Sequence, residues 1–131
     1  MLEVVTQRWP GECGACCVLM IARSAGVSVT REQLDGFAHI GSLGLSAADL
    51  IAMLAALGIE SLGVEMTRDV LHPAHLPCIV HWKPHHFVVL EALNTDTVEV
   101  IDPNVGRLSL SHAEFARGVG AIAIVHRTDE A

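Results

Sequence analysis

Cys13 is the residue in this chain best placed to act as a nucleophile. It begins an apolar run of good helix formers, and Gln7 lies six residues before it. The free N–H groups and partial positive charge at a helix N-terminus lower the pKa of a cysteine thiol from about 8.5 toward neutrality. A side-chain amide and a backbone N–H are donors that can stabilise an oxyanion. The spacing therefore predicts a thiol nucleophile, with Gln7 and the Cys13 backbone N–H as its oxyanion donors.

His86 and Asp102 could supply the remaining chemistry of such a site. His86 opens the apolar run 87–90, and Asp102 closes the run 98–101 directly before a proline. A histidine within hydrogen-bond reach takes the thiol proton and later gives it to the leaving amine. A carboxylate on the other ring nitrogen fixes the tautomer and orientation of the imidazole. We therefore expect His86 to act as the base and Asp102 to orient it.

The adjacent residue His85 is the alternative base. Successive side chains of a strand point to opposite faces, so only one of His85 and His86 can meet Cys13. Because the run 87–90 is apolar on both faces, its periodicity does not choose between the two histidines.

Helices dominate the first half of the chain and strands the second, which predicts an α+β fold. Helices are expected at 13–25, after Thr30, after Ser46 as far as Gly58, and after Ser111. Strands are expected at 59–65, 78–82, 86–92, 98–102 and 121–126, paired in one antiparallel sheet. A hairpin turn at Asn94-Thr95-Asp96 would place His86 and Asp102 near the same end of neighbouring strands.

Composition bounds the size and class of the protein. The chain has 131 residues, which fits a single domain over residues 1–131. Its formal net charge is -7 and its basic residues are scattered, which argues against a nucleic-acid partner. Hydrophobic residues make up 51% of the chain and the mean hydropathy is +0.45, yet no apolar run is as long as a membrane span. The first five residues carry no secretion signal, so we expect a cytoplasmic chain.

The four cysteines form a poor framework for disulfides. Cys13, Cys16 and Cys17 crowd one helical turn, and only Cys78 lies elsewhere. We expect all four to be reduced thiols, with Cys17 and Cys78 buried as small hydrophobic residues. Cys16 is expected in the core, although its place one turn after Cys13 would also allow it to modulate the nucleophile or trap it in a disulfide.

Five short segments occur in a characteristic order. They are Gln7 with Glu12-Cys13-Gly14, Gly44-Leu45-Ser46 with Leu50, Leu76-Pro77-Cys78-Ile79, His86-Phe87-Val88-Val89-Leu90, and Ile101-Asp102-Pro103 with Gly106. Together they resemble the C39 family of peptidases, papain-like domains that cleave leader peptides after a double glycine at the front of bacteriocin and peptide exporters. Glu12 stands where this family usually has aspartate.

The resemblance implies a papain-like cysteine protease fold, with N-terminal helices packed on a C-terminal antiparallel sheet and no cofactor or metal. The site residues that it implies are Cys13 as nucleophile, His86 as base, Asp102 as orienting residue and Gln7 as oxyanion donor. The implied reaction is cleavage of a peptide bond after a Gly-Gly type site in the leader of a bacteriocin-like precursor. A fused or separate ABC exporter would then be the partner, with the peptidase on the cytoplasmic side of the membrane.

Three other functions fit parts of the sequence. A C39-like toxin domain would cut a target protein and have an immunity protein as partner. A thiol-disulfide oxidoreductase could use the C-x-x-C motif of Cys13 and Cys16, but this leaves the other candidate residues without a role. A zinc site could use Cys13, Cys16 and Cys17 with a histidine, but the adjacent thiols of Cys16 and Cys17 cannot both point at one ion without strain.

Overall fold

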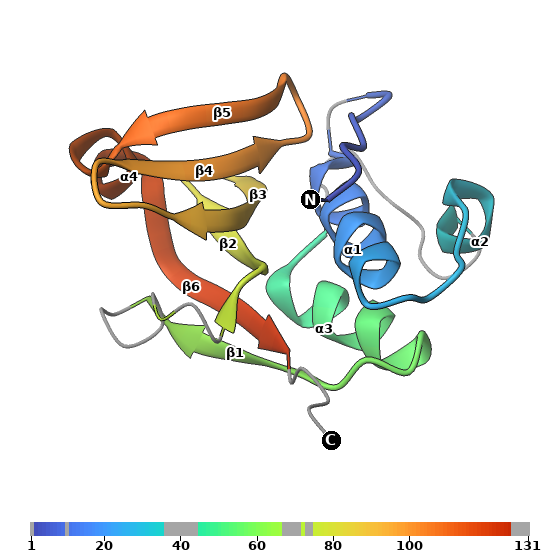
Figure 1. Ribbon diagram of the computed structural model, residues 1–131. Helices are drawn as coiled ribbons and strands as arrows, with labels where there is room; N and C mark the ends of the chain where they lie inside the picture. Colours follow the sequence, from blue (N-terminus) through green and yellow to red (C-terminus); the bar gives the residue numbers. More distant parts are fainter. Residues whose placement is uncertain (1, 10, 36–44, 67–71, 73–74, 127–131) are drawn as a thin grey trace.

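The computed structural model describes residues 2–9, 11–35, 45–66, 72 and 75–126. Its helices are α1 (Cys13–Ser24), α2 (Arg31–Asp35), α3 (Ala47–Ala56) and α4 (His112–Gly118). Its strands are β1 (Ser61–Glu65), β2 (Cys78–Trp82), β3 (His86–Leu93), β4 (Thr97–Asp102), β5 (Gly106–Ser111) and β6 (Val119–His126). Helices α1 to α3 gather beside one sheet, and α4 lies at its far end (Figure 1). The predicted α+β architecture is therefore confirmed.

The six strands form one sheet in the order β1-β6-β2-β3-β4-β5, and every pair is antiparallel. The sequence pattern predicted five of these strands and missed β5. Most residues of β5 are exposed at the edge of the sheet, and they include Arg107 and two serines. Because an exposed edge strand needs no apolar run, the pattern of hydrophobic residues gave no signal for it.

Short polar contacts set the helix boundaries. The Ser46 hydroxyl accepts a hydrogen bond from the Asp49 backbone N–H, and the Ser46 N–H donates to the Asp49 carboxylate. The caps expected at Thr30 and Ser111 form in the same way. Gly58 follows α3 in the left-handed region, with φ at +86°. Among the described residues no helix is long and apolar enough to span a bilayer. The apolar helix α1, for example, has 12 residues.

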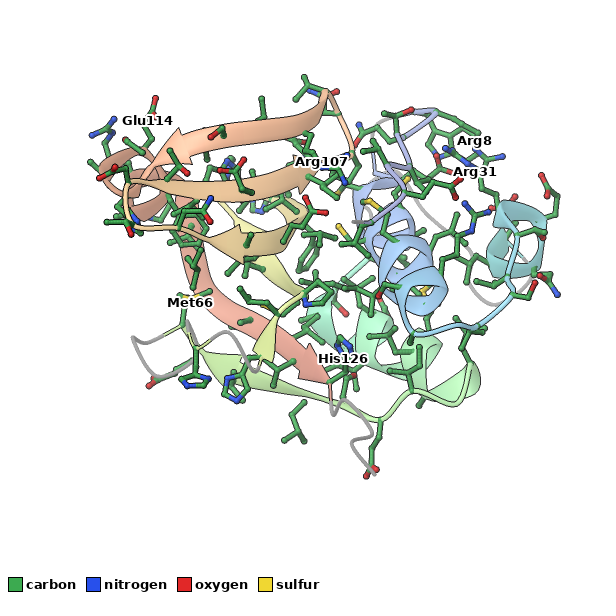
Figure 2. The ribbon with its side chains drawn as sticks, in the orientation of Figure 1. Arg8, Arg31, Met66, Arg107, Glu114 and His126 are labelled. Atoms are coloured by element: carbon green, nitrogen blue, oxygen red, sulfur yellow. The ribbon has the colours of Figure 1, made fainter. Side chains whose placement is uncertain are left out.

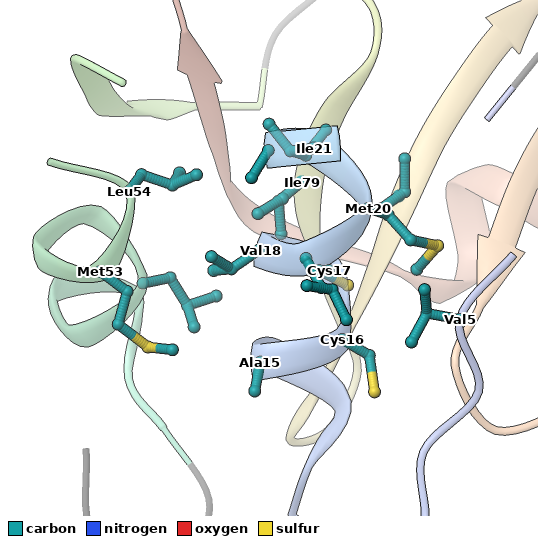
Figure 3. Close-up of a cluster of buried hydrophobic side chains, with 14 of the residues drawn as sticks. Val5, Ala15, Cys16, Cys17, Val18, Met20, Ile21, Met53, Leu54 and Ile79 are labelled. Atoms are coloured by element: carbon teal, nitrogen blue, oxygen red, sulfur yellow. The ribbon is translucent and has the colours of Figure 1, made fainter. Parts of the chain in front are cut away.

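Two apolar clusters pack on the two faces of the sheet, since alternate residues of one strand belong to different clusters. The larger cluster joins α1 to the sheet and to α3 (Figure 3). In it, Cys17, Val18 and Ile21 of α1 are buried with Leu54 of α3 and Ile79 of β2. This packing fixes the position of α1 relative to the strands that follow it in the chain.

The hairpin of β3 and β4 brings distant residues to one end of the sheet. The Asn94 backbone N–H donates to the Thr97 carbonyl oxygen over 2.8 Å, as the predicted turn requires. Val89 then pairs with Ile101, so the start of β3 lies beside the end of β4. His86 and Asp102 occupy these two positions.

Candidate active site

Cys13 is the first residue of α1, as predicted, and only 7% of its surface is exposed. The first hydrogen bond of the helix runs from the Cys16 N–H to the Glu12 carbonyl oxygen, over 3.0 Å. The N–H groups of the first turn have no carbonyl four residues earlier within the helix to accept from them. Cys13 is therefore placed where backbone N–H groups are free to face an anionic sulfur or oxyanion.

The His86 imidazole lies between Cys13 and Asp102. Its Nε2 atom is 2.6 Å from the Asp102 Oδ1 atom. That carboxylate oxygen also accepts a hydrogen bond from the Asn104 backbone N–H over 2.8 Å, which holds it in place. Because Asp102 occupies Nε2, the Nδ1 atom is the ring nitrogen left to meet the thiol, and His86 and Cys13 are hydrogen-bonded to each other.

Electrostatics favour charge on both the thiol and the imidazole. Burial raises the pKa of Cys13, but hydrogen bonds from the His86 side chain and the Phe87 backbone N–H outweigh it, so the pKa lies below its ordinary value. The hydrogen bond to Asp102, followed by the one to Cys13, raises the pKa of His86 to about 9. Burial also raises the pKa of Asp102, yet the hydrogen bond from His86 lowers it overall. At a pH between the pKa of Cys13 and the pKa of His86, the favoured state is therefore a Cys13 thiolate paired with a His86 imidazolium.

The lowered pKa of Cys13 and the raised pKa of His86 together predict a bell-shaped pH dependence of peptide cleavage. Below the pKa of Cys13 the nucleophile is a neutral thiol, and above about pH 9 His86 no longer carries the proton that the leaving amine needs. Asp102→Asn removes the largest cause of the raised His86 pKa. It should move the alkaline limb to lower pH by about one unit or more. Measuring kcat/KM against pH for the two proteins checks this, and an alkaline limb that stays in place would contradict it.

Gln7 reaches the same end of the sheet through its backbone. Its N–H donates to the Pro103 carbonyl oxygen over 2.7 Å, so it lies beside the turn that follows Asp102. The Gln7 Oε1 atom is buried without a hydrogen-bond partner among the described residues. The Gln7 main chain is thus held by this hydrogen bond, and its side-chain amide oxygen accepts none from the described residues.

Glu12 is a prominent residue of the site that sequence reasoning noted only as a departure from the family pattern. It is 2% exposed, yet it carries a carboxylate. Burial raises its pKa, but hydrogen bonds from Arg8 and the charge of Arg31 outweigh that cost and lower it overall, so the group is ionised near neutral pH. The spacing of Arg8 four residues before Glu12 was visible in the sequence, whereas the approach of Arg31 depends on how α2 packs.

The other three cysteines are free thiols buried in the core, as predicted. Burial raises the pKa of Cys16 and of Cys78 to about 12 and raises that of Cys17 well above its ordinary value. A protonated, inaccessible Cys16 is a poor resolving thiol, which argues against the oxidoreductase alternative. Within the described part of the chain, no group of three or more His, Cys, Asp or Glu residues is arranged to hold a metal ion.

The remaining predicted residues lie beside the site or outside the described residues. His85 is exposed and lies in the turn before β3, whereas His86 is the first residue of β3 and is partly buried, so the alternation expected of two strand residues does not apply to this pair. Gly44 of the Gly-Leu-Ser segment lies outside the described residues. The structure therefore brings Cys13, His86 and Asp102 together and places Gln7 at the adjoining turn.

Comparison with known proteins finds the same kind of domain. A model of the Peptidase C39 family matches residues 1–130. The probable microcin-H47 secretion/processing ATP-binding protein MchF of Escherichia coli is 29% identical over 123 residues, and the colicin V secretion/processing ATP-binding protein CvaB of Escherichia coli is 27% identical over 123 residues. Each match covers 94% of this chain but 18% of the relative, so the chain spans about a fifth of their length.

A solved structure matches over nearly its whole length. It is the crystal structure of a double glycine motif protease from an AMS/PCAT transporter in complex with the leader peptide. The TM-score is 0.90 at 25% sequence identity, and the match covers 96% of this chain and 91% of that one.

Proposed function

The chain belongs to the peptidase C39 family of cysteine peptidases, and on that premise we propose that it cleaves leader peptides after a double glycine. The single observation that carries the proposal is the chain of contacts from Cys13 through His86 to Asp102. This arrangement provides a nucleophile, a proton carrier and a carboxylate that orients it. The proposed domain comprises residues 1–131.

In the proposed reaction, the Cys13 thiolate attacks the carbonyl carbon of the peptide bond and forms a tetrahedral intermediate. The His86 imidazolium gives its proton to the leaving amine as the carbon–nitrogen bond breaks, which leaves a thioester on Cys13. Neutral His86 then takes a proton from water as the water attacks the thioester, and the thiolate leaves with the imidazolium restored beside it. Asp102 keeps Nδ1 of the ring aimed at the sulfur throughout.

The carbonyl oxygen becomes anionic in both tetrahedral intermediates. We assign its stabilisation to the Cys13 backbone N–H and the Gln7 side-chain amide. A donor of this kind contributes on the order of 3 kcal/mol to the transition state. The N–H groups at the start of α1 support this assignment. The Gln7 amide oxygen has no hydrogen-bond partner among the described residues, so no bond to that oxygen prevents the amide from presenting its NH₂ group.

The relatives support the choice of substrate and partner. One matched structure is a double glycine motif protease with a leader peptide bound, and two curated relatives are secretion/processing ATP-binding proteins. We therefore assign this chain a precursor peptide with a Gly-Gly leader and an ATP-driven exporter, fused or separate. Because such an exporter uses ATP inside the cell, the proposal places the reaction on the cytoplasmic side of the membrane.

Mass spectrometry of a matched pair of synthetic peptides tests this function. One peptide carries a leader that ends in Gly-Gly, and in the other both glycines are replaced by valine. We expect cleavage of the first after the second glycine and at least about a hundredfold slower cleavage of the second, because the proposed double-glycine specificity implies that branched side chains beside the thiol are excluded. Equal cleavage of both peptides, or cutting only at other sites, would contradict the double-glycine specificity.

A further inference from the structure

The Glu12 carboxylate is the buried centre of an ionic network directly before the nucleophile, whose other members are partly exposed. It accepts hydrogen bonds from the Arg8 side chain, including one from Nε over 2.8 Å, and from the Arg31 Nη1 atom over 3.3 Å. Arg8 and Arg31 come from different parts of the chain and meet near the start of α1 (Figure 2). Arg8 also pairs with Asp35 of α2. The network therefore ties the segment before Cys13 to α2.

The same network holds the backbone on both sides of Gln7. The Arg8 backbone N–H donates to the Glu12 Oε1 atom over 2.7 Å, and Arg31 donates to the carbonyl oxygen of Thr6. Three consecutive residues, 6–8, thus each have a main-chain group held from outside the segment, since Gln7 itself is bonded to the turn after Asp102. Such a set of contacts leaves the segment little freedom to move relative to α1.

A buried charge is costly, and well-packed apolar side chains often stabilise a fold as well as a buried ion pair does. Unlike an apolar side chain, a carboxylate also fixes the positions of its partners, because it accepts several hydrogen bonds in a defined geometry. Here those bonds reach the main chain next to the proposed oxyanion donor. Displacing a catalytic group by about 1 Å can cost a hundredfold in rate, so a rigid support for Gln7 has a direct catalytic consequence.

We propose that Glu12 is a positioning residue that acts through Gln7: its carboxylate, with Arg8 and Arg31, fixes the backbone of residues 6–8 and so holds the Gln7 amide where the oxyanion forms. This inference rests on the proposed function. It separates two roles within the site, since Glu12 supports the oxyanion donor while His86 and Asp102 support the thiolate.

The test compares Glu12→Gln, Gln7→Ala and the double variant on the Gly-Gly leader peptide. Gln7→Ala should lower kcat by about a hundredfold or more. Glu12→Gln should lower kcat by about tenfold or more with little change in KM. The double variant should be within about twofold of Gln7→Ala alone, because Glu12 has nothing left to position once the amide is gone.

Alkylation of Cys13 by iodoacetamide distinguishes positioning from general damage to the site. This reaction needs the thiolate but forms no oxyanion, so Glu12→Gln should alkylate within about twofold of the parent rate. Glu91→Gln is the matched control, because Glu91 also pairs with an arginine, Arg107, and accepts a backbone N–H, that of Leu2. It should keep the parent kcat. If Glu12→Gln does not fold, Arg31→Gln takes its place, with the same pattern expected.

If the parent cleaves the peptide, an unchanged kcat in Glu12→Gln would overturn the inference. So would a double variant whose loss in kcat equals the product of the losses of the two single variants. A rate of Cys13 alkylation in Glu12→Gln that falls together with kcat would overturn it as well. A parent protein that does not cleave the peptide would instead overturn the proposed function, and the inference with it.

Discussion

Replacing Cys13 with alanine should lower peptide cleavage by on the order of ten-thousandfold or more while the protein stays folded. The thiolate is the only group in the proposed reaction that forms a bond to the substrate, and no other group of the site can take over that step. The loss of one buried sulfur atom at the start of α1 changes packing little. Cleavage rates measured by mass spectrometry, together with thermal unfolding of both proteins, check the two parts of this prediction.

Cys16→Ser is the matched control for Cys13→Ala. Cys16 is a second buried thiol one turn further along α1, with its pKa raised to about 12, and serine keeps a donor near the Glu12 carboxylate. If Cys13 acts as a protease nucleophile, Cys16→Ser should retain most of the cleavage rate. If the two cysteines instead worked through a disulfide, Cys13→Ala and Cys16→Ser would both abolish activity. Equal losses in the two variants would therefore contradict the protease mechanism.

Replacing His86 with alanine should have a comparable effect on cleavage, on the order of a thousandfold or more. It removes the proton donor for the leaving amine and also the hydrogen bond that keeps the pKa of Cys13 low. Because burial then dominates, the pKa of Cys13 should rise and its alkylation by iodoacetamide at pH 7 should slow. Both rates can be measured on the same preparation.

His85→Ala is the control for the second prediction. His85 is adjacent in sequence, but its side chain is exposed and lies outside the contacts that join Cys13, His86 and Asp102. The variant should keep the parent rates of cleavage and alkylation. A large loss in His85→Ala with little change in His86→Ala would reverse the assignment of the base.

Much of this site could be predicted because each of its main residues sits at the end of an element that is strongly marked in the sequence. Cys13 begins a helix of good helix formers, and the glycines and polar caps that bound the helices have local signals. The turn at Asn94 similarly set the pairing of β3 with β4, which in turn brought His86 to Asp102. These local sequence signals therefore predicted the contact of His86 with Asp102, because the connection between the two strands is short.

The features that escaped prediction depend on packing between distant segments. Strand β5 is polar and lies at the sheet edge, so it has no hydrophobic pattern. Arg31 and Glu12 are 19 residues apart, and only the placement of α2 beside α1 brings them together. The sequence likewise could not choose between His85 and His86 from periodicity, because neighbouring residues of β3 are buried on both faces.

We propose that Cys13 is the nucleophile that attacks the carbonyl carbon of the second glycine of the leader. The most direct measurement uses a leader peptide whose second glycine ends in an electrophilic vinyl sulfone, which forms a stable thioether with an activated thiolate. Intact-protein mass spectrometry followed by peptide mapping should find one peptide per protein, attached to Cys13, with much slower labelling in His86→Ala. Labelling at another cysteine, or no labelling by a protein that cleaves the matching leader peptide, would contradict the account.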